Sequence, residues 1–345
     1  MGADPVYYPR LPAMPLTLLV PDLLPPADAP EAMRSLRLPG LETWLARADT
    51  SREPGTGNAW LLRQWGLGAG APTAALTLAA DGGPREGTWL RADPVHQRVD
   101  RDALVLHDAA VLALAREEAD EAVGALNEFF AADGLEFVAP SPERWYVRVP
   151  PEELPRTVPL ESAIGRNPFG MLPEGGGRLK WPSIFSEAQM LLARLPSNVS
   201  RQSEGRPTLN AVWFWGGGSF PSGLPRPFSC VAATEALARS LALASGCAVQ
   251  ALPAGPTQLP LRGSGNCLAV IDRLQAPLRR GDVEAWLAAA RDLERDWFGN
   301  LGGALSAFGS LRIVLPSERD TAVFDVAPLA RWRLHRRRRP LAAHA

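Results

Sequence analysis

The sequence of 345 residues has little cysteine, histidine, tyrosine and lysine. Lys180 is the single lysine among 36 basic residues, and 37 acidic residues balance them to a formal net charge of -1. This balance excludes a chain-wide basic surface for nucleic-acid backbones, so we expect no nucleic-acid partner. The three cysteines are odd in number and lack CxxC spacing, which argues against a disulfide framework and a zinc knuckle.

Long apolar runs are also missing. No run approaches the roughly 20 residues that a membrane-spanning helix needs, and no signal peptide opens the chain. We therefore expect a cytoplasmic protein without membrane contact. Proline is abundant, at 34 residues, and it marks places where helices and central strands end.

Apolar runs alternate with helical patterns towards both ends of the chain. Strands are predicted at residues 16–20, 209–215, 248–252, 267–271, 311–315 and 322–326. Helices are predicted at 40–48, 60–65, 234–244 and 282–298, with a polar loop at 50–58. This alternation is typical of an α/β domain.

The middle of the chain has a different pattern. Strands are predicted at 89–99, 103–107, 135–138 and 145–149, with a turn at 100–102, helices at 115–131 and 183–195, and a Pro/Gly-rich connection at 150–180. The first of these helices carries Val123, Leu126, Phe129 and Phe130 on its expected apolar face. We predict an α/β core domain from residues 1–85 and 205–330, an inserted α+β subdomain at 86–204 and a basic tail at 331–345.

Trp213–Gly218 is a hydrophobic strand that runs into three glycines. Such a junction can turn sharply and present backbone N–H groups to an anion, whereas the alternative is a flexible crossover. The sequence has no GxxxxGK[ST] loop here, and its four histidines have no metal-ligand spacing. His96 lies in a polar cluster, where an ordinary structural role is the alternative to a ligand contact. The candidate ligand-binding residues are Arg91, Asp93, His96, Asn210, Trp215, Gly216, Gly217 and Gly218.

The tail is rich in arginine, at 331, 333 and 336–339. It could contact nucleic acid or anionic lipid, but a disordered, solvated end is the favoured interpretation.

Several segments resemble a known family. Asn210–Gly216 is similar to the Asn-x-Ile-Trp-Leu-Trp-Gly strand of archaeal-type cofactor-independent phosphoglycerate mutases, and Leu16–Leu24 to their first strand, which ends in a metal-binding aspartate. Trp89–Asp93 resembles the entry to their inserted subdomain. The combination of LLVPDLL, RADPVH and WFWGGGS resembles RpfE-type bacterial regulatory proteins more closely. The resemblance implies an alkaline-phosphatase-like, phosphoglycerate-mutase-like α/β sheet domain with an inserted α+β subdomain.

The resemblance also implies two divalent metals held by Asp and His, and a serine nucleophile. Asp22 matches the first metal position. The Asp and His of the family's Ala-Pro-Asp-Glu-Ala-Gly-His segment are absent from 276–281, the late histidine is absent from 315–321, and 57–66 lacks the serine. We therefore predict no catalytic residue, no metal and no cofactor, with Asp22 as a vestigial ligand position.

These observations predict a catalytically degenerate relative with a regulatory role. It would act by binding an anionic small molecule or a protein partner. Two alternatives stay open: an enzyme of the phosphomutase or phosphohydrolase type with a rebuilt site, and a protein-interaction scaffold.

Overall fold

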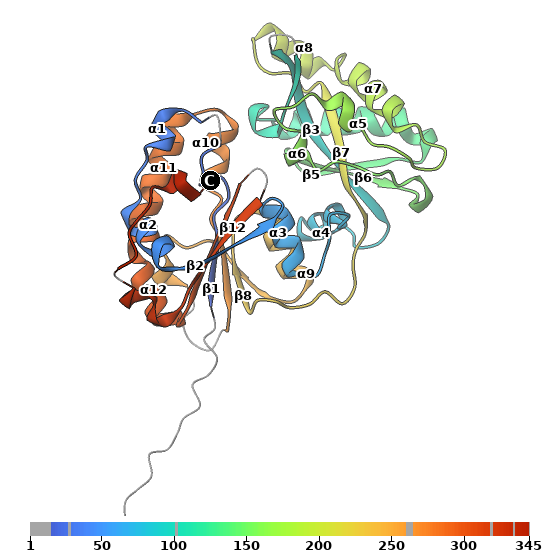
Figure 1. Ribbon diagram of the computed structural model, residues 1–345. Coiled ribbons are helices and arrows are strands. Elements are labelled where there is room, and N and C mark those ends of the chain that lie inside the picture. The colour runs from blue at the N-terminus through green and yellow to red at the C-terminus, as the bar shows by residue number, and fades with distance from the viewer. Residues whose placement is uncertain are drawn as a thin grey trace, which may run out of the picture. The chain divides into compact units, whose positions relative to one another are not determined.

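The computed structural model describes residues 15–26, 29–100, 103–259, 265–317, 320–333 and 335–344. The chain forms two compact units (Figure 1). The described parts of Met1–Trp65 and Pro225–Ala345 make the first unit, and Gly66–Leu224 makes the second. No helix in the described residues is long and apolar enough to cross a membrane.

The first unit is built on a seven-stranded sheet in the order β2-β12-β11-β1-β10-β8-β9. Its strands are β1 (Leu16–Leu19), β2 (Asp49–Pro54), β8 (Cys230–Ala232), β9 (Ala248–Gln250), β10 (Cys267–Val270), β11 (Leu311–Pro316) and β12 (Asp320–Val326). The strands from β11 to β9 are parallel, while β12 and β2 are antiparallel additions at one edge. β1 is fully buried because a parallel strand is covered on both faces.

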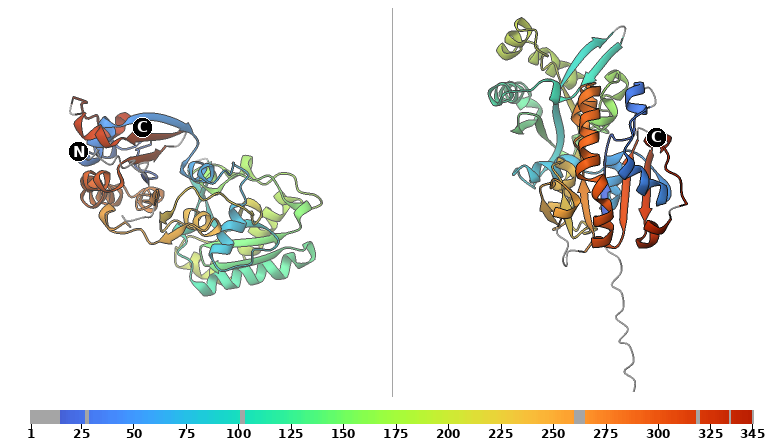
Figure 2. Two further views of the ribbon diagram at one scale, coloured as in Figure 1. Left: turned by 90° about the horizontal axis from the view of Figure 1, so that it is seen from below. Right: turned by 90° about the vertical axis from the view of Figure 1, so that its left-hand side faces the viewer.

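Helices cover both faces of this sheet. They are α1 (Glu31–Arg34), α2 (Pro39–Arg47), α3 (Gly57–Gln64), α9 (Ala236–Ala244), α10 (Gln275–Arg279), α11 (Val283–Asp296) and α12 (Leu301–Phe308). Figure 1 shows α1, α2, α11 and α12 on one side and α3 and α9 on the other. The right-hand view of Figure 2 looks onto the first group, with α11 in front. Alternate residues Leu16 and Leu18 of β1 share the core with this group.

The second unit is an α+β structure. Its elements are α4 (Thr73–Ala80), β3 (Thr88–Asp100), β4 (Ala103–His107), α5 (Arg116–Phe130), β5 (Glu136–Ser141), β6 (Arg144–Val149), α6 (Leu160–Ala163), α7 (Trp181–Leu192), α8 (Pro196–Ser203) and β7 (Ala211–Ser219). The antiparallel sheet has the order β4-β3-β6-β5, and β7 pairs with β3. α5 and α7 contribute to a core on one face, whereas Ala74 and Leu78 of α4 pack with Trp89 and Tyr146 on the other.

The boundaries between the units differ from the prediction, which placed the core domain at 1–85 and 205–330 and the inserted subdomain at 86–204. In the structure they lie after Trp65 and before Pro225. Residues 66–85 and 205–224 belong to the second unit, because β7 pairs with β3 over seven registered positions and α4 packs on the same sheet. A strand is grouped by its hydrogen-bonded neighbour, which the local sequence does not reveal.

Two local predictions are wrong for identifiable reasons. Within the predicted loop at 50–58, Asp49–Pro54 forms β2, since β12 supplies its hydrogen bonds although its side chains are polar. Phe129 is half exposed, because the inner face of α5 passes through Ala119, Ala122, Leu126 and Phe130. By contrast, the helix predicted at 183–195 is confirmed as α7, which ends at Leu192, before α8 begins at Pro196. Part of the turn predicted at 100–102 lies outside the described residues.

Candidate functional site

The carboxyl ends of parallel strands are the usual place for a site in an open α/β sheet. In the first unit, Asp22 follows β1 at this edge with a positive φ of 60°, a conformation that is uncommon outside glycine. The indole N–H of Trp286, on α11, donates to the backbone carbonyl of Asp22 at 2.9 Å and helps to fix the turn. The predicted position of Asp22 at the carboxyl end of a buried strand is therefore correct.

Short helix α10 brings two polar side chains to Asp22. Gln275 and Arg279 are four residues apart, so they lie on one face of α10. Burial raises the pKa of Asp22 above its ordinary value, while the nearby Arg279 guanidinium and a hydrogen bond with Gln275 oppose this shift. The positive charge that faces this carboxylate thus comes from the chain itself.

The donors at this edge do not fit a pair of divalent cations. Asp272, which follows β10, accepts a hydrogen bond from the Thr234 hydroxyl on both carboxylate oxygens, at 3.0 Å. Among the residues that the structure describes, no three His, Cys, Asp or Glu side chains come together as metal ligands. An arginine beside Asp22 repels a cation where a second carboxylate or imidazole would attract it.

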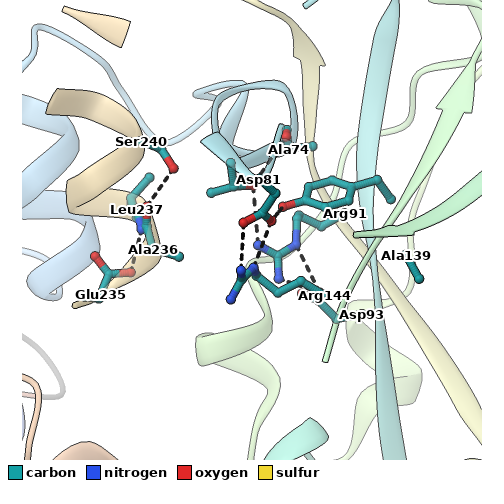
Figure 3. Close-up of polar contacts among 12 residues, drawn as sticks. Ala74, Asp81, Arg91, Asp93, Ala139, Arg144, Glu235, Ala236, Leu237 and Ser240 are labelled. Carbon is teal, nitrogen blue, oxygen red and sulfur yellow. Dashed lines mark hydrogen bonds and ion pairs between the residues drawn. The ribbon is translucent and has the colours of Figure 1, made fainter. Parts of the chain in front are cut away.

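The second candidate group, around Arg91, lies on β3 in the second unit (Figure 3). Arg91 and Asp93 alternate onto the same face of the strand as Trp89, which is the face that α4 covers. The Arg91 guanidinium donates twice to Asp93 Oδ1, at 3.0 and 2.5 Å, and once to Thr77 Oγ1 on α4. Both charged side chains are buried.

Sheet register places an aromatic ring on each side of Arg91. Tyr146 of β6 and Trp215 of β7 are its direct cross-strand neighbours. The guanidinium carbon lies 5.1 Å from the Tyr146 ring centre and 5.5 Å from that of Trp215, within cation–π range. Trp215 also donates its indole N–H to Asp93 Oδ2 at 2.6 Å.

A second ion pair extends this group. Asp81 accepts hydrogen bonds from Arg144 at 2.7 and 3.0 Å and from the Tyr146 hydroxyl at 2.7 Å (Figure 3). Burial alone would raise the pKa of Asp81, but the Arg144 and Tyr146 hydrogen bonds outweigh it and hold that pKa below its ordinary value. For Asp93, burial prevails and raises the pKa although Arg91 and Trp215 oppose it. The two arginines and two aspartates form a charge-balanced internal network.

The remaining candidates also make internal contacts. Asn210 accepts from the Gln97 backbone N–H at 2.7 Å and donates to its carbonyl at 2.8 Å, so it bridges β3 and the start of β7. His96 Nδ1 lies 2.7 Å from the Thr208 carbonyl oxygen. The structure therefore brings the predicted residues into one sheet, where they join strands to one another. Their role in ligand binding stays a prediction.

The three glycines continue β7 and form no turn at the end of a strand, contrary to the predicted junction. Gly216 donates its backbone N–H to Thr157 Oγ1 at 3.2 Å, and Gly218 pairs with Trp89 in the ladder. A Cβ at Gly217 would lie 2.5 Å from a Leu154 methyl group. These positions need glycine because neighbouring segments approach the strand closely.

We expect Gly218→Ala to destabilise the protein by about 1–3 kcal/mol. Gly218 has a φ of 148°, and a Cβ there would lie 2.8 Å from Pro72 Cβ. Gly124→Ala on α5 is the matched control, since nothing lies within 4 Å and its φ is not in the positive region. Alanine in a helix should stabilise by about 0.5–1 kcal/mol. Urea denaturation measures both changes, and equal effects would contradict the close approach at Gly218.

Comparison with known proteins relates the chain distantly to phosphoglycerate mutases. No protein-family model matches it. It is 21% identical over 270 residues to a probable 2,3-bisphosphoglycerate-independent phosphoglycerate mutase of Geobacter sulfurreducens, covering 73% of this chain and 67% of that protein. The chain is thus a distant relative of cofactor-independent phosphoglycerate mutase.

One solved structure is similar in fold, and a second matches more weakly. The PH0037 protein from Pyrococcus horikoshii has a TM-score of 0.51 and 14% identity, over 91% of this chain and 88% of that chain. The cofactor-independent phosphoglycerate mutase from Thermoplasma acidophilum has a TM-score of 0.40 and 15% identity, over 91% and 90% of the two chains. The predicted fold class is confirmed: an α/β fold with a central sheet, in keeping with an alkaline-phosphatase-like architecture.

Proposed function

We propose that this protein is a binding relative of phosphoglycerate mutase that has lost metal-dependent phosphoryl transfer. The observation that carries the proposal is the nearby Arg279 guanidinium, whose charge acts on Asp22 at the carboxyl edge of the sheet. A mutase of the family that the sequence resembles needs further Asp and His ligands there. An arginine in their place supplies a fixed positive charge without a metal.

We further propose that this edge binds an anionic small molecule. Arg279 is exposed, and exposed Arg280 follows it directly. A guanidinium binds the paired oxygens of a phosphate or carboxylate with two parallel hydrogen bonds. The resemblance to RpfE-type proteins suggests the biological role, which is regulation by ligand occupancy and not turnover.

Calorimetric titration with 3-phosphoglycerate, in the presence and absence of Mn²⁺, tests this function. We expect wild-type protein to bind the phosphoester equally well with and without the metal. Arg279→Gln should weaken binding by about tenfold or more, because a charged hydrogen bond contributes about 1.5–3 kcal/mol. Arg291→Gln, at an exposed position on α11, is the control that removes the same charge elsewhere.

Three results of this titration would contradict the proposal. Binding that requires Mn²⁺ would contradict the proposal and favour an enzyme with a rebuilt site. Absence of binding, or equal binding by wild type and Arg279→Gln, would also contradict it. In that case a protein-interaction scaffold becomes the better hypothesis.

A further inference from the structure

The arginine-rich segment after β12 is packed onto the first unit, contrary to the solvated end predicted from sequence. Arg333 donates to both carboxylate oxygens of Asp49, at 2.7 and 3.2 Å, and Arg336 donates to the Ala48 carbonyl at 2.6 Å. Leu341 is 1% exposed. The His344 carbonyl accepts from Arg52 at 2.9 Å. These contacts attach the described part of the tail, on both sides of residue 334, to the sheet edge.

Because the tail is attached, its other side chains have a defined place on the surface. Leu329 and Trp332 belong to a 3₁₀ helix, Pro328–Trp332, and are 71% and 70% exposed. Residues three apart in a 3₁₀ helix lie on the same face, so the two apolar side chains sit together. The Arg331 guanidinium lies 5.9 Å from the Trp332 ring centre.

Four arginines in and after this 3₁₀ helix are exposed: Arg331, Arg337, Arg338 and Arg339. In the described part of the chain none of the four forms an ion pair with a carboxylate, whereas Arg333 and Arg336 are held by Asp49. The sequence from 326 to 345 contains no acidic residue. Among the described residues, the positive charge of these four arginines therefore has no carboxylate ion-pair partner.

The positive charge of the tail also affects His344, near the end of the chain. Burial, together with the positive charges of Arg339 and Arg52, lowers the pKa of His344. The ring of His344 packs edge-on against Phe324 of β12 at 5.3 Å. The field of the arginines thus acts on a group fixed to the folded unit.

We propose that Leu329, Trp332 and these four arginines form a peripheral binding surface for anionic phospholipid membranes. Tryptophan and leucine enter the boundary between headgroups and acyl chains, while guanidinium groups bind the lipid phosphates. The exposed leucine favours a membrane over single-stranded nucleic acid, because leucine adds nothing to base stacking. The residues of this surface are not those of the Asp22–Arg279 edge, and the proposal does not depend on the function proposed there.

Cosedimentation of the full-length protein with lipid vesicles tests the proposal. We expect binding to phosphatidylcholine vesicles that contain phosphatidylserine, little binding to pure phosphatidylcholine, and weakening by salt. The triple variant R337Q/R338Q/R339Q should bind on the order of a hundredfold more weakly. Leu329→Ser with Trp332→Ser should lose about tenfold or more.

The matched control is R98Q/R194Q/R291Q, which removes three exposed arginines outside the tail. It should bind as the wild type does. All variants keep Arg333 and Arg336, so their melting temperatures should equal that of the wild type.

Three results would overturn the proposal: no binding to anionic vesicles, equal binding by the tail variants and the wild type, or equal binding to neutral vesicles. Tail-dependent binding of an oligonucleotide, with none to vesicles, would assign the surface to nucleic acid instead.

Discussion

Arg91→Ala is expected to lower the free energy of unfolding by about 3–5 kcal/mol, because it leaves a buried carboxylate without its cation. The Asp93 side chain is 2% exposed, and of the three hydrogen bonds that its carboxylate accepts it would keep only the one from Trp215. The substitution also removes the guanidinium from between two aromatic rings. Urea denaturation followed by circular dichroism measures the change.

Two further variants separate this effect from the loss of any arginine. Arg148→Ala breaks an exposed pair with Glu136 on the same sheet, and such pairs contribute about 0–1 kcal/mol. Replacing both Arg91 and Asp93 with leucine should recover much of the stability lost in Arg91→Ala, since no unpaired charge remains. If Arg91→Ala cost no more than Arg148→Ala, the network would not have the structural role assigned to it.

The buried strands of the first unit could be predicted from sequence because their signal is local. An apolar run that stops at Pro21 identified β1, and similar runs identified β10 and β11. Gly246, which follows α9, has a positive φ of 72°, as is typical of a glycine just after a helix end. By contrast, β2 has no apolar pattern, and only its pairing with β12, far along the chain, makes it a strand.

The candidate site was predictable in part. The alternation of Arg91 and Asp93 places both on one face, but the sequence does not show that α4 covers that face. The Arg91 and Asp93 side chains, which the sequence suggests are available to bind a ligand, are therefore hydrogen-bonded to each other. At the sheet edge, the resemblance located Asp22, while the approach of Arg279 depends on how α10 packs.

The attachment of the tail to the first unit could not be predicted either, because it depends on contacts between residues far apart in sequence. Arg333 and its partner Asp49 are 284 residues apart in sequence. A run of arginines with no acidic residue nearby in the sequence predicts a solvated segment. Only the folded sheet brings the carboxylate to it.

Purified protein is expected to interconvert 2- and 3-phosphoglycerate no faster than a protein-free blank, at any concentration of Mn²⁺ or Mg²⁺. Enzymes accelerate reactions by at least about a millionfold, so a working mutase would be unmistakable in such an assay. The donors around Asp22 are an arginine and a glutamine, and they cannot replace carboxylate and imidazole ligands. The cofactor-independent mutase of Thermoplasma acidophilum serves as the positive control.

Turnover with added metal is the measurement that tests the central claim most directly. The assay uses the same preparation that binds 3-phosphoglycerate in the calorimeter, so that loss of folding cannot explain a negative result. The predicted result is ligand binding without interconversion at every metal concentration. Metal-dependent interconversion that follows enzyme concentration would contradict the claim that this relative has lost phosphoryl transfer.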